Sequence, residues 1–465
     1  MKDKDVIFFT PGLQDVAPFY LNPFELFKGE KITARADMLK ATFTAAFEME
    51  AAIPQILETS IYRAYEEKGW DVQTNRWNRL EENDPNGAFA DGVYAFPTLS
   101  DFLQAIIKVT ESEGFDSRLK NDYIGSIKAR IESLMVGAKG MMLNTARSID
   151  FGDLINRHVV IELEEIKSGE EKTLLMGFIL TNLLQAIKIR HREDNDFRHI
   201  TLVEEAHRLL SRYEPGDSMS RKQGVGVFAD MLAEVRKYGE SLIIADQIPE
   251  KMTPEVLKNT NTKIVHKLFA KDDKESIGDT MALDDDQKAF LSKLPTGRAV
   301  MLSQGWSKAI QIEVDKITDT DGKEVPLKDI TDISVKYYTE EKVWQRGILR
   351  GSEHVGNRSE ETTRKYLWLL MNGGHLLRIY QAIASDTMPP SDMKWNEFTD
   401  EIKRIRKDVD DSMWQTYLYC NSYEKYDGDK EKIFKNMFND IVQGTKSRDE
   451  LFHGVIRKHL KLRSE

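Results

Sequence analysis

Cysteine is almost absent from this sequence, because Cys420 is the one cysteine in 465 residues. An internal disulfide is therefore impossible, and a zinc site built from several cysteines is excluded. Residues 1–5 lack the apolar stretch of a signal peptide, and no run approaches the ~20 consecutive apolar residues that span a membrane. These absences predict a cytoplasmic protein that does not enter a membrane.

An excess of positive charge is also missing. The chain carries 77 acidic and 66 basic residues, which gives a net charge of −11. This charge excludes a protein that coats nucleic acid with its whole surface, but it leaves room for a ring with an acidic outside and a locally basic pore. Apolar residues make up 40% of the chain and charged residues 31%, so packed cores are expected rather than wholesale disorder.

The hydrophobic pattern predicts an α/β fold with a doubly wound parallel sheet. Residues 5–10 form a first short strand, and from residue 158 onward strands alternate with helices. The expected strands are 158–163, 199–203, 241–245, 263–268, 298–303 and 308–314, and the expected helices are 172–191, 227–238, 253–259 and 284–293.

The same pattern divides the chain into zones. We expect residues 1–32 to begin the α/β core and residues 151–315 to complete it. Between them, residues 33–150 form a helical insertion, with helices over 34–49, 52–68 and 99–113 and a loop over 70–95. Residues 316–345 are expected to be a linker with a short strand over 333–338. Residues 346–465 then form a C-terminal helical domain.

The strand expected over 199–203 ends in two adjacent carboxylates, Glu204 and Glu205. A buried central strand delivers acids in this way to the carboxyl edge of an α/β sheet, where ligands bind. In a nucleotide-hydrolysing site, Glu204 would hold Mg²⁺ and Glu205 would orient and activate the attacking water. The alternative is a strand that runs into an acid-capped helix, with both glutamates favouring the helix N-terminus.

Further motifs follow in a distinctive order. Residues 234–247 read Glu-Val-Arg-Lys-Tyr-Gly-Glu-Ser-Leu-Ile-Ile-Ala-Asp-Gln, a basic helix end capped by Gly239 and a strand that stops at Gln247. Residues 259–268 form an Asn-Thr loop and a strand, and residues 294–302 form a Gly-Arg-Ala turn and a strand. Together with the Glu-Glu-Ala-His segment, this order resembles the HerA branch of the HerA/FtsK ring ATPases. The resemblance extends to segments 10–12, 21–24, 130–140 and 158–163, so that it covers roughly residues 1–315.

The resemblance implies a RecA-like P-loop core that uses ATP and Mg²⁺. It makes Arg236 an arginine finger for the nucleotide of a neighbouring subunit, accompanied by Lys237, and Gln247 a sensor of the γ-phosphate or attacking water. Arg298 would be a second phosphate-sensing cation. The alternatives are that Arg236 and Lys237 complement a helix dipole, that Gln247 satisfies a loop, and that Arg298 is an ordinary surface residue.

Two other features lie near these motifs. His207 follows the acids, and we expect it to orient Glu205 rather than to bind a metal. Residues 211–226 read as a polar loop of about sixteen residues, long for a compact fold. Its Arg221 and Lys222 would suit contacts to nucleic-acid phosphates from a pore loop, and the alternative is a solvated loop.

The phosphate-binding motif G-x-x-x-x-G-K-[ST] does not occur in the sequence. Two explanations fit. The chain is the C-terminal part of a longer motor, which the intact acids and Gln247 favour, or it is a subunit that never binds nucleotide unaided. In either case we expect the chain alone to be inactive as an ATPase.

The resemblance implies a subunit of a hexameric, ATP-driven DNA translocase or helicase. It would pass DNA through its pore to a partner nuclease or effector, in DNA processing or anti-phage defence. One alternative is a conjugation or type IV secretion ATPase, although the sequence shows no membrane anchor. Another is a catalytically silent scaffold subunit of a ring, which the missing phosphate-binding motif favours.

Overall fold

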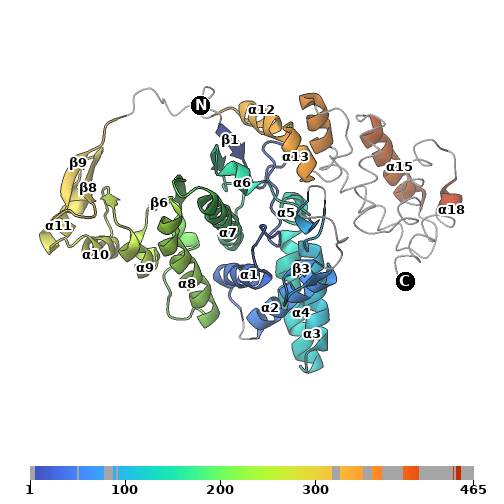
Figure 1. Cartoon of the computed structure of the whole chain (residues 1–465), viewed down its shortest axis with the longest axis horizontal. Helices are drawn as coiled ribbons and strands as arrows, with labels where there is room; N and C mark the ends of the chain where they lie inside the picture. The colour runs from blue at the N-terminus through green and yellow to red at the C-terminus, as the bar shows by residue number, and fades with distance from the viewer. Residues whose placement is uncertain are drawn as a thin grey trace.

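The computed structural model describes residues 6–49, 52–77, 87–90, 93–316, 325–348, 359–368, 391–407, 444 and 447–451. Two parallel strand pairs, joined through a long helix, form its α/β part (Figure 1). In the first pair, β1 (Val6–Phe9) lies beside β4 (His158–Ile161). In the second, β5 (His199–Glu204) lies beside β6 (Glu240–Ala245). The predicted α/β class is therefore confirmed.

The prediction of a fully parallel sheet is wrong for the last three strands. β7 (Lys263–Val265), β8 (Arg298–Leu302) and β9 (Ile310–Glu313) form an antiparallel sheet. The residues that join β8 to β9, 303–309, are too few for the crossover that a parallel pair needs, so these strands form a hairpin. The predicted strands 298–303 and 308–314 are only four residues apart, and so short a connection is typical of an antiparallel hairpin.

The long connection between β4 and β5 is α7 (Gly169–Glu193), in which the predicted helix over 172–191 is confirmed. The Ser168 side chain accepts a hydrogen bond from the backbone of Glu171 and so caps the first turn. By length and composition, α7 alone among the described helices could cross a membrane. However, 67% of its most apolar window is buried inside the fold, as in the core helix of an α/β layer.

The other helices and strands between β1 and β9, apart from the N-terminal helices described below, are mostly short. They are β2 (Trp70–Asp71), β3 (Arg76–Trp77), η1 (Gly87–Phe89), α6 (Phe151–Leu154), η2 (Ala206–Arg208), α8 (Met219–Glu234), η3 (Val235–Tyr238), η4 (Pro249–Lys251), α9 (Pro254–Asn259), α10 (Lys271–Thr280), α11 (Asp285–Phe290) and η5 (Leu291–Lys293). The loop expected over 70–95 therefore contains a small hairpin, β2–β3.

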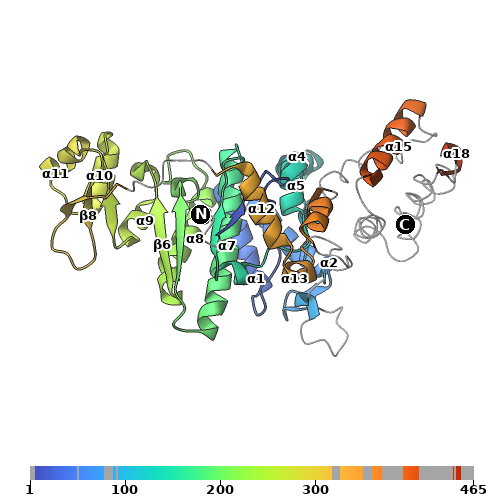
Figure 2. The same ribbon diagram turned by 90° about the horizontal axis from the view of Figure 1, so that it is seen from above.

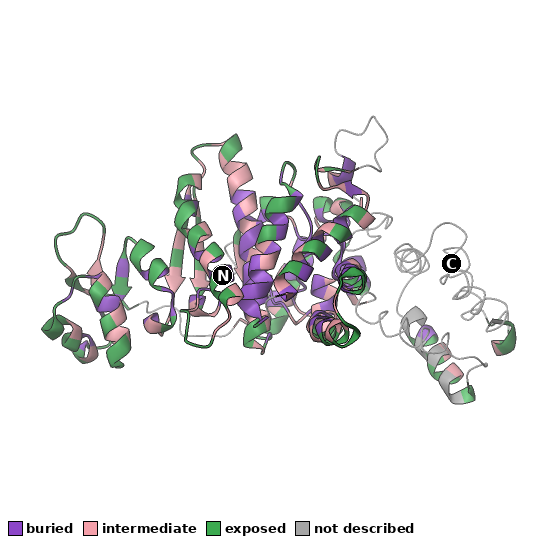
Figure 3. Cartoon of the chain, turned by 90° about the horizontal axis from the view of Figure 1, so that it is seen from below, coloured by how far each residue is buried: buried purple, intermediate pink, exposed green. Residues whose placement is uncertain are grey.

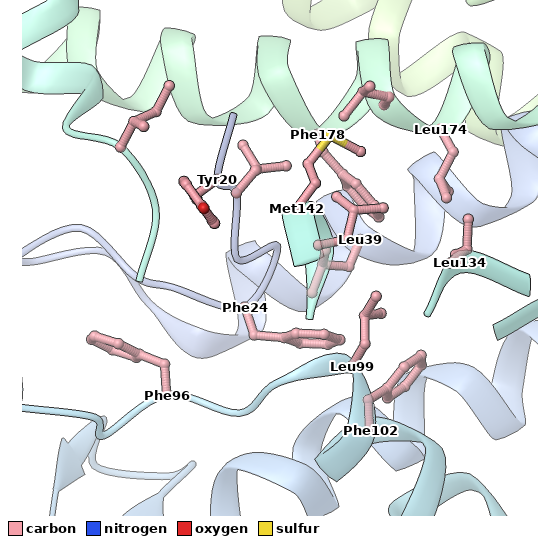
Figure 4. Packing of buried hydrophobic residues seen from close by; sticks show 14 of the residues in the cluster. Tyr20, Phe24, Leu39, Phe96, Leu99, Phe102, Leu134, Met142, Leu174 and Phe178 are labelled. Atoms are coloured by element: carbon pink, nitrogen blue, oxygen red, sulfur yellow. The ribbon is translucent and has the colours of Figure 1, made fainter. Parts of the chain in front are cut away.

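The N-terminal helices share one hydrophobic core with the α/β part (Figure 4). They are α1 (Ile32–Ala46), α2 (Ile53–Glu67), α3 (Leu99–Ser112), α4 (Ser117–Leu134) and α5 (Gly137–Leu143). α1 lies against both α7 and α8 (Figure 1). Gly177 of α7 and Gly224 of α8 permit this close approach, since an added Cβ would lie 2.7 Å from a side-chain atom of Thr42 and 2.6 Å from the carbonyl oxygen of Ala41. The described part of residues 33–150 is mostly helical, and its first helix, α1, belongs to the central layer.

The predicted linker over 316–345 is wrong for most of its length. α12 (Leu327–Tyr338) and α13 (Glu341–Arg346) are helices packed on the core, so the short strand expected over 333–338 is also wrong. Tyr338 is fully buried, donates a hydrogen bond from its hydroxyl to the Pro18 carbonyl oxygen at 2.8 Å, and packs edge-on against Phe9. The buried positions Ile330, Ser334, Val335 and Tyr338 lie at i, i+4, i+5 and i+8, which is a helical rather than an alternating pattern.

The predicted C-terminal helices are described only in part. Residues 360–368 are helical, as are α15 (Asp392–Lys407) and α18 (Arg448–Leu451). The rest of the predicted C-terminal helical domain lies outside the described residues.

One face of the β5–β6 pair is open. Ile200, Leu202 and Ile243 are 65%, 58% and 51% exposed, whereas Val203 and Ile244 on the other face pack over α7 and α8. Most buried residues belong to the helices at the centre of the molecule (Figure 3). The β5–β6 pair lies to one side of these helices, and its residues are mostly intermediate or exposed (Figures 2 and 3). The prediction of a fully buried central strand therefore holds for one face only. Parallel strands normally have both faces covered, so this apolar face is unusual.

Candidate functional site

The acidic pair lies where β5 ends beside β6. Glu204 is aligned with Ala245, and the backbone N–H of Glu205 donates a hydrogen bond to the Ala245 carbonyl oxygen at 3.0 Å. The backbone of Glu205 adopts the left-handed helical conformation, with φ 50° and ψ 39°. This conformation is uncommon for a residue with a side chain, and such residues concentrate at functional sites. The turn directs the chain away from the sheet immediately after the two acids.

The Glu205 carboxylate is half exposed and contacts the Arg208 guanidinium, with Oε2 2.6 Å from Nε. This hydrogen bond, together with the nearby positive charges of Arg208 and Lys172, lowers the pKa of Glu205 below its usual value. Glu205 is therefore ionised at neutral pH. A carboxylate with a lowered pKa is a weak base, so this geometry suits orienting a water molecule better than removing its proton.

His207 is bonded to Asp246, not to Glu205 as the sequence suggested. The Asp246 side chain, 2% exposed, accepts from the His207 ring Nδ1 at 2.8 Å and from the His207 backbone N–H at 2.9 Å. Its other oxygen accepts from the Ile248 N–H at 2.9 Å. Asp246 thus ties the end of β5 to the end of β6. Asp246 was not among the residues predicted from the sequence, although it directly follows β6 and His207 lies three residues after the end of β5, at the same edge.

We expect Asp246→Ala to lower the free energy of unfolding by about 2–4 kcal/mol, because it removes three hydrogen bonds from a buried carboxylate. Urea unfolding followed by circular dichroism measures this change. Asp285→Ala, at an exposed position in α11, is the matched control and should change stability by less than about 0.5 kcal/mol. Equal stability of the two variants would show that Asp246 does not hold the strand ends together.

Glu204 and Gln247 lie at this same carboxyl edge. Both are exposed, and neither side chain has a hydrogen-bond partner among the described residues. Carboxylate oxygens are suitable ligands for Mg²⁺, which normally completes its shell with water and phosphate oxygens. The described residues contain no group of three His, Cys, Asp or Glu side chains that could hold a metal by themselves. Glu204 could thus supply one oxygen ligand to Mg²⁺, and water or phosphate oxygens would have to supply the others.

Arg236 and Lys237 lie at the opposite edge of the strand pair. They occupy η3, directly before β6, and β6 separates them from Gln247 by roughly 17 Å at 3.3 Å per residue. Lys237 pairs with Glu234 at 2.8 Å, whereas the exposed Arg236 has no partner among the described residues. The structure therefore does not bring these cations to the acids of the same chain.

The other predicted cations are engaged within the chain. Arg298 pairs across the hairpin with Glu313 at 3.1 Å. Arg221 contacts Glu48 at 3.0 Å, and the Lys222 ammonium lies 5.0 Å from the centre of the Tyr213 ring. Arg221 and Lys222 lie in the first turn of α8, so the loop expected over 211–226 ends at residue 218. The reason is the Ser218 side chain, which caps that turn by accepting from the Arg221 N–H.

Comparison with known proteins identifies relatives of this chain. It is 25% identical over 250 residues to the DNA double-strand break repair helicase HerA of Sulfolobus acidocaldarius, a match that covers 52% of this chain and 48% of that protein. It is 28% identical over 178 residues to HerA of Sulfurisphaera tokodaii, covering 36% and 35% of the two chains. This chain is a relative of the HerA helicases. The resemblance predicted from the sequence is confirmed, and with it the RecA-like α/β class.

The matches to HerA span less than half the length of those helicases. No family model matches the sequence. Among solved structures, VirB4 of Thermoanaerobacter pseudethanolicus is similar with a TM-score of 0.48 and 16% identity, covering 67% of this chain and 77% of that one. The plasmid coupling protein TrwB has a TM-score of 0.42 and 11% identity, covering 68% and 79%. The assignment as a HerA relative rests on the sequence matches.

Proposed function

We propose that this chain forms the acid-bearing part of a HerA-type, ATP-driven DNA translocase. The observation that carries the proposal is the meeting of Glu204, Glu205 and Gln247 at one carboxyl edge, beside a left-handed turn. Two carboxylates and an amide at such an edge are groups that can hold a metal ion and position the attacking water in nucleotide hydrolysis. The names of the curated relatives, which are helicases, agree with this reading.

Each residue has a role that its position supports. Glu204, exposed and unpaired among the described residues, would hold Mg²⁺, which supplies charge neutralisation at the phosphates when bound. Glu205, ionised and held by Arg208, orients the attacking water. Gln247 contacts that water or the γ-phosphate from the neighbouring strand.

The open face of β5–β6 supports a phosphate-binding segment supplied from outside the described residues. Ile200, Leu202 and Ile243 expose an apolar surface that runs up to the acids. A strand and an amphipathic helix would cover this face, and the loop between them would lie at the edge that carries Glu204 and Glu205. Residues 1–465 alone are then expected to hydrolyse ATP barely, because nothing in the sequence matches a phosphate-binding loop.

The position of Arg236 supports assembly into a ring. Since it lies at the edge opposite the acids, it acts as a finger only on the nucleotide of a neighbouring copy. We propose further that the ring is a hexamer in the cytoplasm, with DNA in its pore and a nuclease or effector as its partner, as the resemblance seen in the sequence implied.

DNA binding tests the proposal. We expect the assembled protein to retain duplexes of unrelated sequence equally, with log affinity falling linearly as log salt rises, because a translocase grips the backbone. Arg221→Ala with Lys222→Ala should flatten the slope by roughly one to two units. Fluorescence anisotropy over a salt series measures both. No binding by the assembled protein at low salt would contradict the proposed function, and an unchanged slope would remove these two residues from the DNA contact.

A further inference from the structure

The turn between β8 and β9 carries an exposed tryptophan. Residues 303–309 form this turn, and the backbone N–H of Trp306 closes it by donating to the Ser303 carbonyl oxygen at 3.1 Å. Trp306 is 42% exposed, although tryptophan side chains are highly buried on average. Its ring contacts no aromatic ring or cation among the described residues. The turn projects from the end of the β7–β9 sheet (Figures 2 and 3). The indole ring is therefore presented to a partner.

A second segment lies beside this turn. The hydroxyls of Thr262 and Ser303 share a hydrogen bond of 2.9 Å, which joins the loop before β7 to the start of the turn. Exposed polar side chains lie on both segments and on the last turn of α9. We call them, together with the tryptophan, the hairpin-tip surface, and its members are Lys258, Asn259, Asn261, Gln304, Trp306 and Lys308.

The hairpin-tip surface carries positive charge and no negative charge. Residues 256–264 and 303–312, to which all of its members belong, contain no aspartate or glutamate, although acidic residues outnumber basic ones in the whole chain. Neither Lys258 nor Lys308 forms an ion pair within the part of the chain that the structure describes. Both lysines are therefore available to a negatively charged partner.

This surface adjoins the one on which DNA contacts are proposed. α9 packs against α8, and Glu255 of α9 lies near both Lys258 and Lys222. A hydrogen bond from the Thr253 hydroxyl lowers the pKa of Glu255, and the charges of Lys258 and Lys222 lower it further. Basic side chains therefore continue from the first turn of α8, along α9, to the turn between β8 and β9.

The composition of the hairpin-tip surface fits a single strand of nucleic acid. An exposed indole ring stacks on the face of a base, while lysines and amides bind phosphates and base edges. Bases within a duplex are already stacked on their neighbours, so the ring finds a free face on an unpaired strand. A protein partner is the alternative, since Ile264 and Ile310 expose apolar side chains on the adjoining sheet. The lysines without a nearby unpaired carboxylate, and their continuity with Lys222, favour nucleic acid.

We propose that the hairpin-tip surface binds single-stranded DNA, with Trp306 stacked on a base and Lys258 and Lys308 bound to phosphates. The choice of DNA rests on the proposed function. With this surface, the protein holds a duplex at α8 and an unpaired end of the same DNA at the turn between β8 and β9. The stacking contact does not depend on ATP hydrolysis and is tested separately.

Binding of two DNA probes by residues 1–465 tests the proposal. The probes are a labelled single strand of mixed sequence and a blunt duplex that contains the same strand. Fluorescence anisotropy over a salt series measures the affinity of the wild type, of Trp306→Ala, of Trp306→Phe and of Lys258→Ala with Lys308→Ala. The matched control is Phe290→Ala, which removes a 40% exposed aromatic side chain from α11. Circular dichroism verifies that each variant is folded.

We expect Trp306→Ala to weaken binding of the single strand by about 5- to 100-fold, because it removes one stacked base. Trp306→Phe should stay within about threefold of wild type, since a phenyl ring also stacks. Both variants should bind the blunt duplex within about twofold of wild type. The double lysine variant should flatten the salt dependence for the single strand by roughly one to two units, and Phe290→Ala should bind both probes like wild type.

Two results would overturn the proposal: wild-type binding of the single strand by Trp306→Ala, or an equal loss of single strand and duplex in that variant. If Trp306→Ala instead weakens self-association in sedimentation velocity and leaves DNA binding unchanged, the surface is a protein contact. Failure to bind the blunt duplex, with Trp306-dependent binding of the single strand intact, would count against the proposed function and leave this inference standing. A wild-type protein that binds neither probe would overturn both.

Discussion

Replacement of Glu205 by Gln is expected to lower ATP hydrolysis by the assembled ATPase by roughly 100- to 1000-fold, while nucleotide affinity stays within about threefold. The amide keeps the shape of the side chain but loses the negative charge that orients water. It also weakens the contact to Arg208, which holds the carboxylate in the wild type. Steady-state hydrolysis at saturating ATP and equilibrium binding of a fluorescent nucleotide measure the two effects.

The matched control for this variant is Glu164→Gln, an exposed glutamate at the same edge of the molecule. It should leave hydrolysis within about twofold of wild type, since surface substitutions away from the reacting atoms have small effects. Equal losses in both variants would indicate that the general charge of this edge matters and that Glu205 has no distinct role.

Replacement of Phe9 by Ala is expected to lower the free energy of unfolding by about 3–5 kcal/mol, as is usual for a buried aromatic side chain. Phe9 is fully buried on β1, and its ring centre lies 5.6 Å from that of Phe19 and 5.4 Å from that of Tyr337 on α12. Chemical denaturation measures the change. The substitution leaves a cavity between the first strand and a helix some 330 residues later in the chain.

The control is Phe290→Ala on α11, where the side chain is 40% exposed. It should cost about 1 kcal/mol or less. If Phe9→Ala cost no more than this control, α12 would not be packed on the core, and residues 327–338 would belong to a linker, as the sequence predicted.

The elements near the site could be predicted because their signals are local. The apolar run before Glu204 and the glycine after the basic turn mark the strand β5 and the end of η3 without knowledge of the rest of the fold. The ends of β5 and β6 meet because adjacent parallel strands share a carboxyl edge, which places Glu204 near Gln247 as expected.

The features that were missed depend on distant contacts. The sequence around Tyr338 does not indicate that its hydroxyl donates a hydrogen bond to the Pro18 carbonyl oxygen. The segment that forms α12 was therefore predicted to be part of a linker. Ser218 begins α8 earlier than the hydrophobic pattern suggests, because a cap requires no apolar residue. The pairing of His207 with Asp246 depends on the register of two strands, which the sequence of either strand does not specify.

The open face of β5–β6 could not be predicted for another reason. A strand with apolar residues at Ile200, Leu202 and Val203 is typical of a position covered on both faces. The sequence of a strand shows which of its side chains are apolar enough to be buried. It does not show which other segment covers them.

ATP hydrolysis by residues 1–465 with Mg²⁺ and duplex DNA tests the central claim most directly. The comparison is with the same chain joined to a strand, a phosphate-binding loop of the G-x-x-x-x-G-K-[ST] type and a helix. We predict a background rate for residues 1–465 alone and a DNA-stimulated, Glu205-dependent rate for the joined protein. Rapid, Glu205-dependent hydrolysis by residues 1–465 alone would contradict this account, because the chain would then hold the phosphates by itself.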